Sequence, residues 1–280
     1  MGVRGSRQSH FWMSLALVIV PAAVSVQQPP LTAPYVTTRA EAETFLSKAT
    51  VVTDAPADGR KNWRATLDSG SRTHDASIET ADGSDPTRRN YRFNVAAYEL
   101  DKLLDLNLLV PTVERVIGGR AASVAWWLDA FAMTELDRRR RGLEPPEPES
   151  WARQMHAVRV FDELISNTYR DTSPPLYLNS VWDNLLITKD WTIWLTDHTG
   201  AFRIRRALQD PEGLTRCPRG VLGKLRALNR GLLQRTLGRY LSAEQIEAMD
   251  VRRVLLVRHV DEQITRDGEA AVLYDLASRR

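Results

Sequence analysis

The sequence predicts an α+β fold in two lobes: a small β-rich N-lobe that contains one long helix, followed by a mainly helical C-lobe. Two observations support this prediction. Segments that alternate in polarity dominate the first half of the 280-residue chain, whereas helical periodicity dominates the second half. Strands and helices that are grouped in this way along the chain are typical of α+β folds and not of alternating α/β folds.

The N-lobe is expected over residues 39–129. Its strands are indicated by alternating polarity and by turn residues such as Gly70, which stands at the centre of an expected β-hairpin. Its long helix is indicated by apolar residues that recur at helical spacing from Phe93 to Leu104. In chain order we expect a helix at 39–48, strands at 63–68 and 73–80, a helix at 91–104, and strands at 110–117 and 121–129.

The C-lobe is expected over residues 130–280. The run RRRRGLEPPEPE at 138–149 is interpreted as a helix end that leads into a solvated loop, with an anion site as the alternative. Ser242, with Gln245 three residues later, predicts a helix start of the capping-box type. In chain order we expect a helix at 151–167, strands at 184–188 and 192–196, and helices from residue 221 onward.

Residues 1–26 have the pattern of a secretory signal peptide. Arg4 and Arg7 precede the uncharged run 11–26, which falls short of the roughly 20 apolar residues that cross a bilayer. The proline-rich residues 27–38 are expected to form an extended linker. We therefore expect export to the periplasm or the extracellular space, with no stable membrane insertion after cleavage. The alternative is an uncleaved membrane anchor.

Charge and cysteine content exclude several classes of protein. The 38 basic and 35 acidic residues give a net charge of only +3, and two of the positive charges belong to the expected signal peptide. Proteins that bind nucleic acids concentrate basic residues on one face, so we expect no nucleic-acid partner. The single cysteine, Cys217, excludes an intramolecular disulfide and any multi-cysteine zinc site. It is expected to be buried and inert, or else to pair between molecules.

The candidate chemistry centres on two polar residues of the second half. Asn184 opens one expected strand, and Asp197 closes the next one, thirteen residues later. Because a hairpin brings its two ends together, these oxygen-bearing side chains are expected to converge on one Mg²⁺ or Mn²⁺ ion. Alternatively, Asn184 is a turn residue and Asp197 caps the end of its strand. His198 is expected to be a packed structural histidine, with a role as a switch or base as the alternative.

Other possible sites are weaker. His74 and Asp75 are adjacent on an expected strand and would point to opposite faces, which argues against a shared metal ion. By the same argument, at most one of Trp126 and Trp127 can approach an adenine ring. The sequence contains no Gly-x-Ser-x-Gly hydrolase motif, no Walker loop and no dinucleotide-binding glycine pattern.

The region around Asn184 and Asp197 resembles the atypical branch of the protein-kinase fold, which includes phosphatidylinositol 3/4-kinases, HipA-type kinases and secreted kinases. The catalytic-loop pattern matches at its start, NTYR at 167–170, and at its end, DNLL at 183–186, and the metal-binding motif matches DHT at 197–199. The flanking segments FNVAAYELD, VPTVER and DWTIWL are similar to those of a group of exported bacterial proteins that we associate with this fold. The resemblance implies a kinase-like domain over 39–280, with ATP and Mg²⁺ (or Mn²⁺) as cofactors and with Asn184 and Asp197 as the metal ligands.

The chain departs from the pattern of this family at the catalytic residues. Tyr169 occupies the position of the catalytic aspartate, and a tyrosine, with a reference pKa of about 10, cannot act as a carboxylate base at neutral pH. Asp171 is the candidate replacement. The strand at 73–80 lacks the family's phosphate-binding lysine and carries Glu79 near its end. Asn94 stands where the long helix should carry the partner glutamate.

These features predict a kinase-like phosphotransferase scaffold whose activity is weak or lost. Its substrate would be an unidentified protein or small molecule outside the cytoplasm. The alternative is a non-catalytic module of the cell envelope, a pseudokinase that binds a ligand or a protein. The enzyme would be favoured if Asp171 or Asp183 lay near the Asn184–Asp197 pair with an arginine or lysine opposite.

Overall fold

The computed structural model describes residues 1–2, 38–53, 62–80, 90–129, 131–167 and 182–277. Residues 3–26 of the expected signal peptide and all but the last residue of the linker lie outside the described residues. So do Tyr169 and Asp171. Within the described part of the chain, no helix has the length and apolar character needed to span a membrane.

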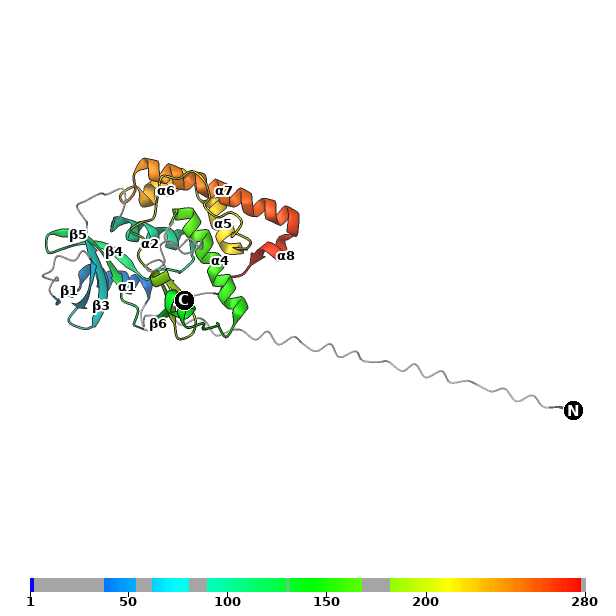
Figure 1. Ribbon diagram of the computed structural model, residues 1–280, viewed down its shortest axis with the longest axis horizontal. Helices are drawn as coiled ribbons and strands as arrows, with labels where there is room; N and C mark the ends of the chain where they lie inside the picture. The colour runs from blue at the N-terminus through cyan, green and yellow to red at the C-terminus, as the bar shows by residue number, and fades with distance from the viewer. Residues whose placement is uncertain (3–37, 54–61, 81–89, 130, 168–181, 278–280) are drawn as a thin grey trace.

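The N-terminal half forms a five-stranded antiparallel sheet with strand order β1-β2-β3-β5-β4 (Figure 1). The predicted hairpin is confirmed, because the whole of β2 pairs with β3, from Asn62↔Glu79 to Asp68↔Thr73. The elements of this lobe are α1 (Arg39–Lys48), β1 (Thr50–Val51), β2 (Asn62–Asp68), β3 (Thr73–Thr80), α2 (Arg92–Leu104), β4 (Thr112–Ile117) and β5 (Arg120–Trp126).

One face of this sheet is covered by α1. Ala76, Ile78 and Thr80 alternate as the buried residues of β3, as expected for a strand with one face on a core. Phe45 of α1 packs edge-on against Trp126 at the end of β5, with 5.7 Å between the ring centroids. The lobe therefore has its own hydrophobic core.

The C-terminal half is mainly helical, with two small sheets. The predicted strand pair is present as β7 and β8, and it is joined by β6 in a three-stranded antiparallel sheet. The capping box at Ser242 and Gln245 is confirmed at the start of the longest helix. The elements are β6 (Phe131–Thr134), α3 (Glu135–Arg140), α4 (Pro148–Ile165), η2 (Trp182–Asn184), β7 (Leu185–Thr188), β8 (Ile193–Leu195), β9 (Cys217–Pro218), α5 (Arg219–Ala227), α6 (Arg230–Leu237), α7 (Ala243–Asp267), α8 (Glu269–Val272) and β10 (Leu273–Tyr274).

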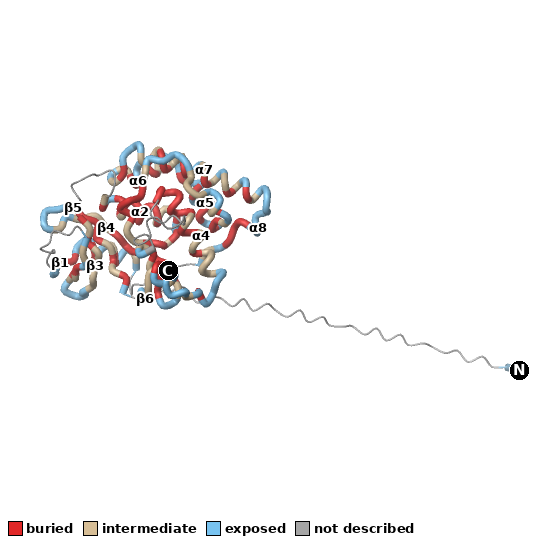
Figure 2. The backbone as a smooth tube through the Cα atoms, viewed as in Figure 1, coloured by how far each residue is buried: buried red, intermediate tan, exposed pale blue. Residues whose placement is uncertain are grey.

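Helix α2 joins the two lobes. Its buried residues, among them Phe93, Tyr98 and Leu104, belong to the hydrophobic core of the helical lobe, although the helix lies between two strands of the sheet in the sequence. Figure 2 shows buried residues along α2 in the interior of the molecule. Towards the N-lobe, the Tyr98 hydroxyl donates to Glu43 of α1 at 2.6 Å, and Arg39 pairs with the fully buried Asp101 at 3.2 Å. The helix is therefore packed on one lobe and bonded to the other.

The structure corrects several expected boundaries. Helix α4 begins at Pro148, three residues before the predicted start, because proline is well suited to the first turn of a helix. Strand β5 ends at Trp126 and not at residue 129. The arginine run does begin as a helix end, in α3, where Arg138 and Arg139 bond the buried carboxylate of Glu135 at 2.6 and 2.7 Å. The sequence prediction had no counterpart for β6.

The Cys217 thiol is fully buried, and burial raises its pKa to about 12. Because only the thiolate reacts with disulfide reagents, we expect the native protein to react with dithiobis(nitrobenzoate) at least about 100-fold more slowly than the urea-unfolded protein at pH 8. Absorbance at 412 nm measures both rates. Rapid reaction of the native protein, or a disulfide-linked dimer on a non-reducing gel, would contradict the inert role.

A candidate ligand cleft between the lobes

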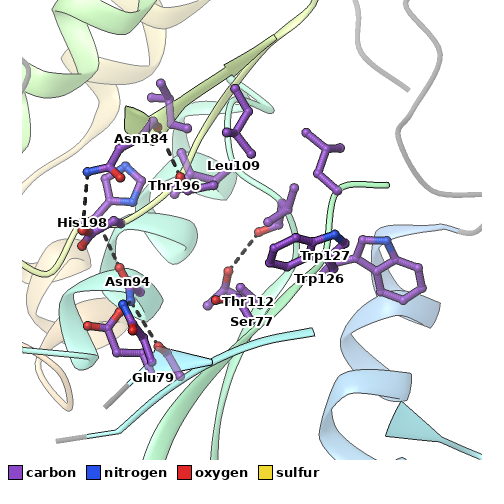
Figure 3. A pocket seen from close by; sticks show the side chains of 18 of the residues that line it. Ser77, Glu79, Asn94, Leu109, Thr112, Trp126, Trp127, Asn184, Thr196 and His198 are labelled. Atoms are coloured by element: carbon purple, nitrogen blue, oxygen red, sulfur yellow. Dashed lines mark hydrogen bonds between the residues drawn. The ribbon is translucent and has the colours of Figure 1, made fainter. Parts of the chain in front are cut away.

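A cavity of about 290 Å³ lies between the two lobes. Its walls come from β3, β5 and α2 on one side and from the hairpin region 184–198 on the other. In Figure 3 the polar side chains of Glu79, Asn94, His198 and Asn184 gather at one end, whereas Trp126 and Trp127 lie at the opposite end. The cleft thus has a polar end and an aromatic end.

Asn184 and Asp197 lie together at the polar end. The Asn184 Nδ2 is 3.4 Å from the Asp197 Oδ2, and the Asn184 carbonyl accepts from the Thr196 amide at 2.9 Å, which holds the two ends of the hairpin side by side. The Asp197 Oδ1 accepts from the amide and hydroxyl of Thr199 at 3.2 and 2.5 Å. The approach of the two side chains therefore occurs together with a capping contact, which was the alternative to a role of Asp197 as a metal ligand.

The donor set of this pair suits a hard divalent cation. A carboxylate oxygen and an amide oxygen are the ligands that Mg²⁺ accepts, with water and phosphate completing its coordination. Rotation of the Asn184 amide by half a turn exchanges its nitrogen for its oxygen and so brings two oxygens to the same place. Among the described residues there is no group of three or more His, Cys, Asp or Glu side chains that could hold a metal ion.

Asp183 does not join the pair in this arrangement. Its exposed carboxylate accepts from the Thr134 hydroxyl at 3.3 Å, next to the start of α3. Asp171, the candidate catalytic carboxylate, lies outside the described residues. Asp183 therefore does not support a general base at the cleft.

Asn94 connects three parts of the cleft. Its Nδ2 donates to the Glu79 carboxylate on β3 at 3.0 Å and to the Ser123 hydroxyl on β5 at 3.2 Å. Its Oδ1 accepts from the His198 amide at 2.7 Å. Glu79 and Asn94, which depart from the family's lysine and glutamate, thus bond each other. The carboxylate lies on the strand and the neutral amide on the helix.

His198 is buried in the helical lobe. Its side chain is 2% exposed, and its ring lies edge-on to Phe161 at 6.1 Å between centroids. The following residue, Thr199, accepts from the Asn90 amide at 2.9 Å just before α2. These contacts agree with the expectation of a packed structural histidine.

The aromatic end is held by His74. Its ring stacks on Trp126 at 3.7 Å between centroids, and its Nε2 is 3.1 Å from the Trp127 carbonyl. The Trp127 amide donates to the Asp75 carbonyl at 3.1 Å. Trp126 packs in the N-lobe core beside Phe45. Both tryptophans nevertheless line the cavity, and not one at most as expected, because β5 ends at Trp126 and Trp127 lies beyond the alternation of the strand.

His74 and Asp75 diverge as expected and do not form a shared site. Asp75 accepts from the Thr66 hydroxyl at 2.7 Å and from the Arg64 Nε at 2.5 Å. Burial raises the pKa of the Asp75 carboxyl, but the hydrogen bonds from Thr66 and Arg64 outweigh it and hold that pKa below its ordinary value. His74 instead faces the exposed Asp129 at 3.5 Å, in the segment that joins the lobes.

Two carboxylates lie at the polar end of the cleft. Glu79 and Asp197 line the cavity, and none of the described lining residues is a lysine or an arginine. Lys102 of α2 and Arg138 of α3 form ion pairs with glutamates, and neither of these basic residues lines the cavity. Glu79 and Asp197 both make further interactions within the protein.

Comparison with known proteins identifies the architecture. A crystal structure of the Helicobacter pylori proinflammatory kinase CtkA matches with a TM-score of 0.50 and 10% sequence identity, over 79% of this chain and 96% of that chain. The protein has a kinase-like fold. No family model matches the sequence, and no curated protein matches it.

The fold gives the cleft its context. The antiparallel sheet and the helical lobe are the two lobes of a kinase-like scaffold, and the cavity lies between them. At 10% sequence identity, the structural similarity shows the fold and does not show the chemistry. The chemistry has to be argued from the residues of this cleft.

Proposed function

We propose that this protein is a kinase-like protein whose cleft binds a purine nucleotide together with Mg²⁺ or Mn²⁺, and that its phosphoryl transfer is weak or absent. The observation that carries the proposal is the convergence of Asn184 and Asp197, 3.4 Å apart, at the polar end of an interlobe cavity. Asn184 and Asp197 would hold the cation, which when bound offsets phosphate charge. Export of the chain beyond the cytoplasm, and a protein or small molecule as its partner, are part of the same proposal.

Weak transfer follows from the groups that surround the metal pair. A positioned base contributes about 10²–10⁴ to a rate. Stabilisation of charge that develops in the transition state is usually the largest single contribution. Tyr169 replaces the carboxylate that the fold family uses as a base, and the Glu79–Asn94 pair replaces a cation and its partner.

Calorimetric titration of the full chain with ATP, in the presence and absence of MgCl₂ or MnCl₂, tests the binding part. We expect metal-dependent binding to weaken at least about tenfold in Asp197→Ala, which removes the carboxylate ligand. The matched control is Asp183→Ala, because that carboxylate is close in sequence and bonds Thr134 instead. Equal binding by wild type and Asp197→Ala would contradict the metal site, and thermal melts within about 2 °C of wild type would show that both variants are folded.

An autophosphorylation assay with radiolabelled ATP tests the activity part. We expect no labelling of the wild type above that of Asp197→Ala. Robust labelling that Asp171→Ala abolishes would contradict this expectation and make Asp171 the catalytic residue.

A non-catalytic ligand-binding module is the second candidate function. It is favoured by the composition of the cleft, because its described lining residues include no lysine or arginine that could bind a phosphate. If neither wild type nor Tyr169→Asp binds a nucleotide, this candidate replaces the first.

A further inference from the structure

The segment 203–210, which contains no helix or strand, is anchored to buried charged groups at two points. Near its start, the fully buried guanidinium of Arg252 on α7 donates to the carbonyl of Arg203 at 3.1 Å and to that of Arg205. At its end, the buried carboxylate of Glu163 on α4 accepts from two successive backbone amides at 2.8 and 2.7 Å. Because a buried charge is unfavourable unless it is hydrogen-bonded, these contacts couple the conformation of the segment to the core of the helical lobe.

The side chains between the two anchors are exposed and meet a basic side chain of α6. Ile204, Arg205 and Arg206 all reach solvent, and Ile204 is 51% exposed. Arg206 lies beside Arg230 at the start of α6, because their guanidiniums contact the two oxygens of one carboxylate, that of Glu247, at 3.2 and 3.3 Å. We refer to Ile204, Arg205, Arg206 and Arg230 as the arginine surface.

The arginine surface carries more positive charge than its contacts neutralise. Glu247 is shared between two guanidiniums and can offset only one of them. Arg205 donates to the side chain of Gln209 at 3.5 Å and to a backbone carbonyl at 3.4 Å, both of which are neutral groups. The buried Glu163 interacts with the charges of both Arg252 and Arg205, so it cannot offset both. An excess of positive charge therefore remains at the exposed side chains.

An acidic protein segment has the chemistry that fits this surface. The planar fork of a guanidinium matches a carboxylate, and arginine is enriched at protein interfaces. The exposed Ile204 adds an apolar contact among the charged side chains, which an apolar side chain of a peptide could cover. Because the segment is already held by its two anchors, little conformational entropy would be lost there when a partner binds.

We propose that the arginine surface is a docking site for an acidic segment of another protein. Carboxylates of the partner would contact the three guanidiniums, and an apolar side chain between those carboxylates would cover Ile204. None of the four residues of the arginine surface lines the interlobe cavity. The inference therefore stands apart from the proposed nucleotide site and adds an interaction surface to the helical lobe.

The experiment is a fluorescence-anisotropy titration of a labelled peptide with the full chain. The probe is a short peptide in which a central leucine is flanked by aspartates and glutamates, and a second peptide carries the corresponding asparagines and glutamines. We expect the acidic peptide to bind the wild type at least about tenfold more tightly than the amide peptide does. Ile204→Ser should weaken binding of the acidic peptide at least about threefold. The double variant Arg205→Gln/Arg206→Gln should weaken it at least about fivefold.

Two matched controls lie on α7, outside the arginine surface. Val254 is also 51% exposed, so Val254→Ser removes a comparable apolar side chain. The double variant Arg258→Gln/Arg266→Gln removes two guanidiniums that are each 68% exposed. Both controls should leave the affinity for the acidic peptide within about twofold of that of wild type. Thermal melts within about 2 °C of wild type would show that all variants are folded.

Three outcomes would overturn the docking site. The first is that the wild type binds the acidic and amide peptides equally, or binds neither. The second is that the controls on α7 weaken binding as much as the substitutions in the arginine surface do. The third is that the arginine substitutions weaken binding while Ile204→Ser has no effect, which would leave only a general attraction for anions.

Discussion

Replacement of Arg252 by methionine is expected to lower the free energy of unfolding by about 2–4 kcal/mol. Arg252 lies on α7 and is fully buried. Its Nε donates to the Leu164 carbonyl at 3.0 Å, and its Nη1 donates to the Arg203 carbonyl at 3.1 Å and to the Arg205 carbonyl. Burial lowers the pKa of this guanidinium to about 10.

Two effects of this substitution oppose each other. Removal of a buried charge relieves a desolvation cost, which favours methionine. Loss of the guanidinium leaves the carbonyls of Leu164, Arg203 and Arg205 without this donor. A buried carbonyl that loses its partner costs about 1–3 kcal/mol, and a partly buried one, which water can reach, costs less. Because three carbonyls lose a donor and a single charge is relieved, we expect the loss to prevail.

Urea denaturation followed by circular dichroism measures the effect. Arg258→Met is the control on the same helix, since Arg258 is 68% exposed and is 3.7 Å from Glu262. Exposed pairs of this kind contribute about 0.3–0.5 kcal/mol. If Arg252→Met and Arg258→Met had the same midpoint, the carbonyl contacts of Arg252 would be energetically unimportant.

Asn94→Asp is expected to make the stability of the protein fall as the pH rises. The substitution places a second carboxylate at the position of the Asn94 Nδ2, which is 3.0 Å from the Glu79 Oε2. Two carboxylates at this distance cannot both be ionised at low cost, so one proton is retained and the pKa of the pair is raised in the folded state. The folded protein then binds one proton more than the unfolded protein between about pH 4.5 and the raised pKa.

The extra proton that the folded Asn94→Asp variant binds sets the direction in which its stability changes with pH. The variant is most stable below the ordinary carboxyl pKa, and stability is lost with rising pH until the raised pKa is passed, by up to about 1.4 kcal/mol per pH unit. Urea midpoints at pH 5 and pH 8, compared with those of wild type, measure it. The double variant Glu79→Gln/Asn94→Asp is the control, because it removes one of the two charges and should abolish the added pH dependence. A pH-independent difference between Asn94→Asp and wild type would show that the two side chains do not share the contact.

Elements with strong local signals could be predicted from the sequence. Apolar residues recur at helical spacing from Phe93 to Leu104, and Gly70 marks a hairpin. Helix α2 and the β2–β3 pair are found at these predicted positions. The proximity of Asn184 and Asp197 was also predictable, because the register of one hairpin fixes both ends. Their role as metal ligands stays a prediction.

The rest of the cleft depends on contacts between distant segments. The sequence marks Glu79 and Asn94 as departures from a pattern, but it does not show that they bond each other across 15 residues. Ser123 was missed, because a serine in an alternating strand carries no signal of its own. Strand β6 was missed because it has only four residues and pairs with a segment more than fifty residues away.

The position of α2 has a consequence for how the cleft communicates with the surface. The helix is packed in the core of one lobe and hydrogen-bonded to the other, and Asn94 near its start faces the cleft. A ligand that seats against Asn94 would therefore contact a helix that is bonded to both lobes. If such a ligand changed the position of α2, the two lobes would be expected to respond together. Any second ligand sensitive to that position would then, by thermodynamic reciprocity, change the affinity of the first by the same factor as the first changes its own.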